Sequence, residues 1–169
     1  MKKIILTQGY SAIVDDDDFR WLSQWSWNAC NWRKAGCKDQ IYAGRTDTRT
    51  RLTVRMHVEI AKAHGIWIRG RQIDHIDQDR LNNRSDNLRA ATRSQNAQNR
   101  SKRQGCTSRF KGVSWKKSLG KWQAAVHSNG KSIYLGVFET EIDAAKAYDA
   151  AALGLFGEFA ALNQSKGEK

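Results

Sequence analysis

Residues 71–100 read RQIDHIDQDRLNNRSDNLRAATRSQNAQNR, a run unusually rich in Asp, Asn and Arg. The pattern predicts a short strand over 73–76, a polar, turn-rich loop over 77–86, and then a helix. Residues 85–87 (Ser-Asp-Asn) mark the expected start of that helix, which should run on through Asn96. One strand–loop–helix unit therefore gathers a histidine, several carboxylates and several side-chain amides.

These residue types suit the hydrolysis of a phosphodiester. That reaction needs a base to activate water and a divalent cation to neutralise charge on the phosphate and the leaving oxygen. His75 is the natural base at neutral pH, and Asp74 and Asn96 offer the hard oxygen ligands that Mg²⁺ prefers. Adjacent residues of a regular strand point to opposite faces, so Asp74 and His75 share a site only if the strand ends or bends there.

The combination of an Asp-His strand, an Asn-rich loop and a further Asn on the helix resembles the ββα-metal site of HNH endonucleases, in the Asn-ending variant of phage homing enzymes. The resemblance implies that His75 is the general base and that Asp74 and Asn96 hold one Mg²⁺ or Mn²⁺ ion. It also implies that Asn87 fixes the loop and orients His75. Because the last residue is Asn where the commonest pattern has His, zinc is less favoured. A hairpin and helix with surface polar residues is the alternative interpretation.

The residues before this unit predict a small antiparallel sheet with two short helices. Asp15 to Asp18 are interpreted as an N-cap and first helical turn and not as a metal site, because anions stabilise a helix N-terminus. His57 and His64 are interpreted as structural or surface histidines. Strands are expected at 4–14 (a pair), 27–32, 40–46 and 51–56, and a helix at 57–64.

The chain is strongly basic, with a formal net charge of +12 over 169 residues. No Asp or Glu occurs from Ser101 to Phe138, so the positive charge is localised. Clustered cations of this kind serve a polyanionic partner, and nucleic acid is the leading candidate over a basic but inert surface. The polar segment 96–110 is typical of an exposed linker, and we place a domain boundary near Gln104.

Residues 110–163 predict three short strands and one helix. Turns are expected at 118–120 and 128–130, where Asn-Gly is a strong hairpin signal, and Thr140 is expected to cap an alanine-rich helix over 141–153. The segments FKGV at 110–113, GKW at 120–122, LGVF at 135–138 and AAKAYD at 144–149 together resemble the AP2/ERF DNA-binding domain.

The AP2 resemblance implies that the sheet lies in the major groove and contacts bases and phosphates. Trp122 is equally compatible with a core position. Several arginines of the family are Lys, Ser or His here, so bidentate guanine recognition is weakened and the family's site preference does not transfer. The contacts carried over are Lys111, Trp115, Lys116, Lys121, Trp122 and His127, and the neighbouring basic residues Arg93, Lys102, Arg103 and Lys117 are added as DNA contacts.

Other classes are disfavoured. No apolar run approaches the roughly 20 residues that span a bilayer, and the N-terminal run is too short for a signal peptide, so a cytoplasmic protein is expected, in a bacterial host if phage-encoded. The cysteines, at 30, 37 and 106, form no CxxC pair that would indicate a disulfide framework or zinc site. No RNA-recognition motif with paired sheet aromatics is present, although charge alone does not exclude RNA.

The sequence therefore predicts an α+β protein in two parts. Residues 1–104 form an HNH nuclease domain with its ββα-metal motif at about 71–100, and residues 105–169 form an AP2-like domain of three strands on one helix. The expected function is metal-dependent hydrolysis of double-stranded DNA by a monomer that cuts one strand per encounter, as in a homing endonuclease of a phage or mobile element. The alternative is a DNA-binding transcriptional regulator with a relic nuclease fold.

Overall fold

A computed structural model describes residues 1–31, 41–102, 105 and 107–163 of the chain. The chain divides into two compact units, Met1–Arg93 and Ser94–Lys169, which are described separately below. Within the described residues, no helix is both long enough and apolar enough to cross a membrane.

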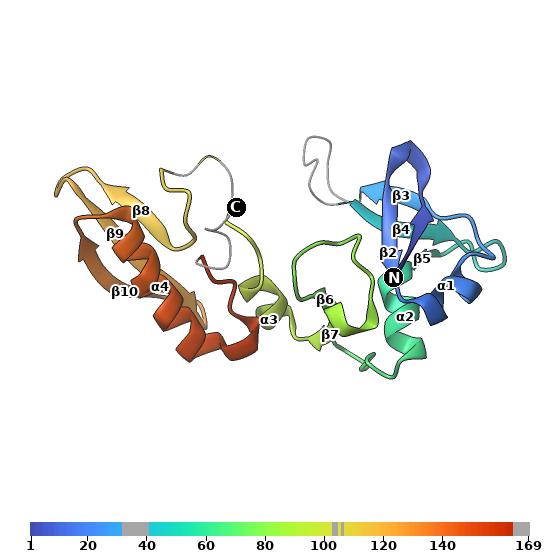
Figure 1. The fold of residues 1–169 in the computed structure, drawn as a ribbon. Helices are drawn as coiled ribbons and strands as arrows, with labels where there is room; N and C mark the ends of the chain where they lie inside the picture. The colour runs from blue at the N-terminus through green and yellow to red at the C-terminus, as the bar shows by residue number, and fades with distance from the viewer. Residues whose placement is uncertain (32–40, 103–104, 106, 164–169) are drawn as a thin grey trace. The chain divides into compact units, whose positions relative to one another are not determined.

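The first unit contains three small antiparallel sheets and two α-helices (Figure 1). The sheets are β1–β2, β3–β4–β5 and β6–β7, each paired in chain order. The strands and helices are β1 (Lys2–Ile5), β2 (Ser11–Val14), α1 (Asp16–Leu22), β3 (Asn28–Asn31), β4 (Ile41–Thr46), β5 (Thr53–Arg55), α2 (Met56–Ala63), β6 (Gln72–His75) and β7 (Leu88–Ala91), with 3-10 turns η1 (Thr7–Gly9) and η2 (Ser85–Asn87).

One hydrophobic core holds these elements together. Val14, Leu22, Met56 and Ile60 are fully buried and bring β2, α1 and α2 into contact, and Leu88 of β7 joins the same core. Burying side chains of this size stabilises the fold by roughly 1.5–3 kcal/mol each. Helix α2 and the strands around His75 therefore belong to one rigid body.

The loop between β6 and β7 is attached to β2 by backbone hydrogen bonds. Ile13 N donates to Leu81 O at 2.7 Å, and Asn83 N donates to Ile13 O at 2.8 Å. The middle of this loop, which contains no strand, is therefore held by strand-like pairing on both sides of Asn82. This attachment fixes the backbone that carries the polar residues following His75.

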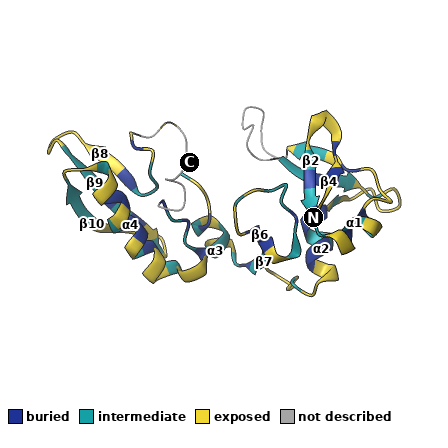
Figure 2. Ribbon diagram, viewed as in Figure 1, coloured by how far each residue is buried: buried dark blue, intermediate teal, exposed yellow. Residues whose placement is uncertain are grey.

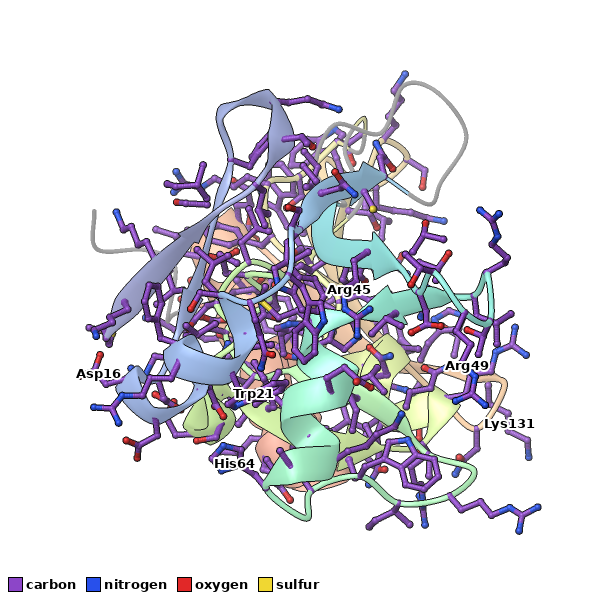
Figure 3. All side chains as sticks on the ribbon, turned by 90° about the vertical axis from the view of Figure 1, so that its right-hand side faces the viewer. Asp16, Trp21, Arg45, Arg49, His64 and Lys131 are labelled. Atoms are coloured by element: carbon purple, nitrogen blue, oxygen red, sulfur yellow. The ribbon has the colours of Figure 1, made fainter. Side chains whose placement is uncertain are left out.

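The acidic run before α1 is structural, as expected. Asp15 is the N-cap, but its carboxylate does not cap the helix; it accepts hydrogen bonds from Ser85 N (2.8 Å) and Ser85 Oγ (2.7 Å). Burial raises the pKa of the Asp15 carboxyl. The hydrogen bonds from Ser85 and the nearby Arg84 lower it by more, so the net pKa is below 3.8. Asp18 is buried and is bound by Trp21 Nε1 and His64 Nε2, which lie on the same side of the unit (Figure 3). His64 is thus a structural histidine.

The predicted helix over 85–96 is wrong in its first half. Residues 88–91 form β7, which pairs antiparallel with β6 in the register Asp74↔Arg89 and His75↔Leu88. The α-helix begins only at Arg93, and residues 85–87 form the single 3-10 turn η2. The Ser85 hydroxyl, expected to start a helix, bonds Asp15 instead. Cross-strand pairing has overridden the helical preference of the alanines in this segment.

The second unit has the predicted three-stranded sheet and one long helix, which confirms the α+β class (Figure 1). The strand order is β10–β9–β8, and Figure 2 shows that the buried side of α4 faces this sheet. Thr140 caps α4, accepting a hydrogen bond from Asp143 N at 3.1 Å. The elements are α3 (Arg93–Gln98, starting in the first unit), β8 (Val113–Lys116), β9 (Lys121–Ser128), β10 (Lys131–Phe138), α4 (Glu141–Phe156) and the 3-10 turn η3 (Gly157–Phe159).

Small residues let α4 approach the sheet closely. Ala144, Ala145 and Ala152 are buried against β8 and β9. Gly112 has φ +75°, and a Cβ there would clash with the Tyr148 ring of α4, so only glycine fits. Burial, followed by the nearby Asp149, raises the pKa of Tyr148 to about 12. The division between units at 93/94 precedes the predicted boundary near Gln104, which stays a prediction.

Candidate active site and nucleic-acid interface

His75, the predicted general base, is buried at the end of β6 with only 5% of its surface exposed. Its Nε2 lies 3.2 Å from Asn83 Oδ1, and Asn83 is itself fully buried. Asn83 Nδ2 donates to Leu81 O, which turns the amide oxygen toward the imidazole. An amide oxygen can only accept, so His75 carries its hydrogen on Nε2 and Nδ1 is the basic nitrogen of the neutral ring.

Two aromatic rings from distant segments pack on His75. The His57 ring of α2 lies 5.0 Å from the His75 ring at 66°, and the Tyr42 ring of β4 lies 6.2 Å away, centroid to centroid. Arg80 Nε donates to Tyr42 Oη at 2.9 Å. His57 is 4% exposed, and its Nδ1 has no hydrogen-bond partner among the described residues. Sequence reasoning missed Tyr42 and Asn83 as site residues. Asn83 lies in the Asn-rich loop that the sequence singles out, whereas no local signal marks Tyr42.

Both imidazoles are kept neutral by their surroundings. Burial lowers the pKa of His75 below 6.5, opposed by the bond to Asn83 and the charges of Asp77 and Asp74, and assisted by Arg80. Burial, with the neighbouring His75 and Arg55, lowers the pKa of His57 well below 6.5. A neutral imidazole is the form of histidine that accepts a proton.

Asp74 is buried beside His75 in the chain but is engaged by a different neighbour. Arg89, its cross-strand partner, donates to Asp74 Oδ2 from Nε (3.1 Å) and Nη2 (3.0 Å). A cation at Asp74 would share this carboxylate with the arginine. No group of three or more His, Cys, Asp or Glu side chains that could hold a metal occurs within the described ranges. Carboxylate and amide oxygens nevertheless have the donor chemistry of a Mg²⁺ or Mn²⁺ ligand.

Asn87 fixes the loop through three hydrogen bonds. Its Nδ2 donates to Asp77 Oδ1 (2.9 Å) and Asn82 O (2.8 Å), and its Oδ1 accepts from Asp77 N at 3.1 Å. These bonds cross the loop that begins directly after His75. The hydrogen bond to His75 Nε2 comes from Asn83, whereas the three bonds of Asn87 go to the loop that follows His75.

Asn96, the predicted second metal ligand, is half-buried on α3. It belongs to the second unit, and its position relative to Asp74 is not determined. Arg93, at the start of α3, is exposed. The pairing of Asp74 with Asn96 around one cation therefore stays a prediction.

The β8–β10 sheet separates the predicted DNA contacts onto two faces. Val113 pairs with Ala124 beneath α4, and the Trp115–Trp122 pair continues that face, with ring centroids 5.0 Å apart. The opposite face carries the cross-strand pair Lys116–Lys121 and, further along β9, the exposed His127, with Gln123 between them. On the same face β10 contributes Tyr134, 60% exposed, which sequence reasoning missed.

Several of the predicted lysines have partners within the chain. Lys102 Nζ donates to Phe110 O (2.7 Å) and Val113 O (3.2 Å), and Lys111 Nζ donates to Gln98 O. Lys121 Nζ lies 2.6 Å from Glu139 Oε1.

The remaining predicted DNA contacts and the cysteines fall into two groups, those that the structure describes and those outside the described residues. Lys116 and Lys117 are exposed. Arg103, Cys37 and Cys106 lie outside the described residues, and burial raises the pKa of the free Cys30 thiol.

Comparison with known proteins finds two family matches in succession. Residues 54–98 match the family described as HNH endonuclease, and residues 108–158 match the family described as AP2 domain. The first match contains His57, His75 and Asn96, and the second contains β8, β9, β10 and α4. Both resemblances stated from the sequence are confirmed.

Individual relatives are viral, phage and plant proteins. An uncharacterized HNH endonuclease, L560, of Acanthamoeba polyphaga mimivirus is 44% identical over 92 residues, covering 54% of this chain and 46% of that protein. Protein 3.8 of Escherichia phage T7 is 38% identical over 78 residues, covering 46% and 64%. APETALA2-like protein 2 of Oryza sativa subsp. indica is 39% identical over 57 residues, covering 34% and 13%. The chain thus spans less than two thirds of these relatives, and no solved structure matches it.

Proposed function

We propose that this chain, in which an HNH endonuclease segment is followed by an AP2 domain, is a divalent-metal-dependent endonuclease of double-stranded DNA. The observation that carries the proposal is His75, a buried imidazole of lowered pKa whose Nε2 is engaged by Asn83. Its tautomer is therefore set, and Nδ1 is the base. A fixed, neutral imidazole at a strand end is suited to general base catalysis near pH 7.

The chemistry follows from this arrangement. His75 Nδ1 takes a proton from a water molecule, the water oxygen attacks phosphorus, and the bond from phosphorus to the leaving oxygen breaks. Asn83 and Asn87 hold the ring and the loop, so little reorganisation is needed. Asp74 and Asn96 would hold one Mg²⁺ or Mn²⁺ ion, which supplies positive charge against the charge that develops on the phosphate and leaving oxygen.

The AP2 domain supplies the second contact with DNA. The outer sheet face with Lys116, Lys121 and His127 is the part of the second unit that fits a duplex. Phosphate contacts position the protein, and side chains that reach base edges add sequence preference. Arg93, Lys117 and Arg103 would extend the contact along the backbone. Trp115 and Trp122 would support this sheet from the helix side.

A phage or mobile-element nicking enzyme is the setting we propose. One candidate site per chain favours cutting one strand per encounter by a monomer. The mimivirus and phage T7 relatives support the viral setting. The target sequence would be selected largely by the AP2 part.

Cleavage of a supercoiled plasmid with and without Mg²⁺ tests the activity. His75→Ala should reduce nicking by at least about 10²-fold while leaving DNA affinity nearly unchanged, because a general base acts in the chemical step. His64→Gln is the control, since His64 bonds Asp18 away from this site. A loss of less than tenfold in His75→Ala would assign the base to another residue.

The cation is tested by titration. Asp74→Ala and Asn96→Ala should each raise the Mg²⁺ or Mn²⁺ concentration for half-maximal nicking, because each removes an oxygen from an ion with few protein ligands. Asp86→Ala, which removes an exposed carboxylate that pairs with Arg84, is the control. If both variants keep the wild-type half-saturation, the cation binds elsewhere.

The competing function is a DNA-binding regulator with a relic nuclease fold. The presence of the full candidate set Asp74, His75, Asn87 and Asn96 argues against it, because a relic fold has no chemistry that would require these four residues together. Binding of duplex DNA without nicking in either Mg²⁺ or Mn²⁺, at protein concentrations that saturate the plasmid, would favour the regulator.

A further inference from the structure

Two large apolar side chains are exposed side by side in the loop between α2 and β6. Trp67 is 43% exposed and Ile68 is 54% exposed, while their neighbour Ile66 packs against the hydrophobic core. Burying such side chains on folding would have gained roughly 1.5–3 kcal/mol each. Large apolar side chains that are exposed next to one another are typical of binding surfaces.

The backbone of this loop is fixed by hydrogen bonds. Ile66 N and Trp67 N both donate to Ala61 O, at 2.8 and 2.9 Å, which ties the loop to the end of α2. Arg71 N donates to Ile68 O at 3.0 Å, and Gly70 has φ +80°, so residues 68–71 form a tight turn. The two apolar side chains are therefore presented by a preformed loop, and little conformational entropy is lost when they bind.

The same loop carries unneutralised positive charge. Arg69 and Arg71 are exposed, and within the described part of the chain the side chain of neither forms an ion pair or hydrogen bond. Residues 65–73 contain no acidic residue. By contrast, Arg45, Arg84 and Arg89 of the same unit each pair with an aspartate. An apolar tip flanked by free guanidinium groups complements a base stack flanked by phosphates.

The loop leads directly into the strand that carries Asp74 and His75. Five residues, 69–73, separate Ile68 from Asp74. The six Cα-to-Cα steps from Ile68 to Asp74 span at most about 20 Å of extended chain, and successive bases of one strand are about 3.4 Å apart along the helix axis. Ile68 therefore lies no more than about six base steps from Asp74, so the loop is within reach of a duplex bound at this site.

We propose that residues 66–71 form a wedge that opens a base step of the bound duplex near the scissile bond. Trp67 and Ile68 enter the base stack, and Arg69 and Arg71 bind the flanking phosphates. Unstacking a step costs a few kcal/mol, and the exposed apolar surface and the phosphate contacts offset it. This proposal rests on the proposed function and adds a mode of DNA distortion to it.

Unwinding of closed circular DNA tests the wedge. The full-length His75→Ala protein is bound to a plasmid without divalent cations, a metal-independent type I topoisomerase relaxes it, and the topoisomers are resolved after protein removal. Opening base steps should shift the distribution of linking numbers in proportion to bound protein. Adding Trp67→Ala and Ile68→Ala should reduce the shift at least twofold at equal occupancy. Leu52→Ala, at a side chain 67% exposed in the same unit, should leave it unchanged.

The arginines have a separate readout. Arg69→Gln with Arg71→Gln should lower the slope of log K against log salt concentration by about 1.8, because each phosphate contact contributes about 0.9. Arg49→Gln with Arg51→Gln is the matched control, in the exposed turn between β4 and β5 where Arg49 is seen in Figure 3. An unchanged slope in the Arg69 and Arg71 variant would overturn their assignment to phosphates.

The outcomes separate the two proposals. The side chains substituted in the loop and in the controls are exposed, so thermal unfolding of each variant should match that of its parent, His75→Ala or wild type, and confirm that it folds. If the wild type nicks DNA with Mg²⁺ but the topoisomer shift survives loss of Trp67 and Ile68, only the wedge is overturned. Blue-shifted tryptophan emission with phosphatidylglycerol vesicles, lost in Trp67→Ala, together with no topoisomer shift, would assign the loop to a lipid surface. Absence of nicking by the wild type counts against the proposed function alone.

Discussion

His75 depends for its properties on single residues that lie far from it along the chain. Asn83 fixes its tautomer, and the rings of His57 and Tyr42 pack against it. Each of these contacts is made by one side chain, so each can be tested by one substitution. The most informative substitutions change charge or titration while keeping the shape of the side chain.

Asn83→Asp should move the pH dependence of nicking. An anionic carboxylate beside Nε2 stabilises the imidazolium, so the pKa of His75 rises and the base is lost at a higher pH than in the wild type. The acidic limb of the rate profile, measured from about pH 5.5 to 8.5 with saturating Mg²⁺, should shift upward. Asn83→Ala should slow nicking by at least about tenfold, but less than His75→Ala does. An unmoved acidic limb in Asn83→Asp would show that Asn83 does not act on the base.

His57 should make stability depend on pH. The folded chain holds it neutral, with a pKa well below 6.5, whereas in the unfolded chain it binds a proton near pH 6.5. As the pH falls through 6.5, protons bind preferentially to the unfolded chain, and the free energy of unfolding decreases by up to about 1.4 kcal/mol per pH unit. His57→Phe keeps an aromatic ring and should reduce this loss. Urea unfolding at pH 7.5 and 5.5 measures it, and equal losses in both proteins would contradict the prediction.

Among the elements, the junction of β2 and α1 determines where the β6–β7 loop lies. Backbone pairing with Ile13 holds the middle of the loop, and Asp15 binds Ser85 at its end. The N-terminal hairpin thus supports the candidate site without contributing a side chain to its chemistry. Disturbing this junction should affect stability and activity together.

Asp15→Ala should lower the free energy of unfolding by about 1–3 kcal/mol, because Ser85 N and Oγ lose a charged acceptor. In a double-mutant cycle with Ser85→Ala, the two losses should be coupled by about 0.5–3 kcal/mol. Asp16→Ala is the control, since its exposed carboxylate is at the same helix end and should change stability by no more than about 0.5 kcal/mol. Additive losses in the cycle would mean that the Asp15–Ser85 bond does not hold the loop.

For the whole molecule, the two units have separate hydrophobic cores. Residues 98–102, expected from the sequence to be part of a linker, belong to the second unit, where Lys102 and Lys111 tie them to the residues at the start of the β8–β10 sheet. Residues 94–104 should therefore contribute to the stability of the AP2 part. The lysines in these bonds should contribute less to DNA binding than the exposed ones.

A fragment of residues 94–169 should unfold at a higher temperature than 105–169, and both should bind duplex DNA with strong salt dependence. In the full chain, Lys116→Ala should reduce the salt slope by about 0.9, because its exposed ammonium group releases a counterion on binding. Lys102→Ala should leave the slope unchanged and lower stability instead. Gel shifts at several salt concentrations measure the salt slope of each variant. A reduced slope in Lys102→Ala would show that Lys102 contacts DNA after all.

Local patterns in the sequence were sufficient for the second unit. The Asn129-Gly130 turn has φ +50° and +75° and joins β9 to β10, and Thr140 caps α4 as predicted. These features depend on neighbouring residues, so a single sequence specifies them. The Asp-His strand end and the Asn-rich loop were equally recognisable, because their residue types occur together over a short stretch of sequence.

Long-range packing decided the conformation of residues 88–91 and the neighbours of His75. Neither can be predicted from a local pattern in the sequence. Leu88–Ala91 has good helix formers, yet it is a strand because β6 offers hydrogen bonds along its whole length. Asn83 and His57 join His75 only when the β6–β7 loop docks on β2 and α2 packs on the core. Sequence spacing specifies which side chains can react, whereas the burial that holds their protons in place comes from segments that meet only in the folded chain.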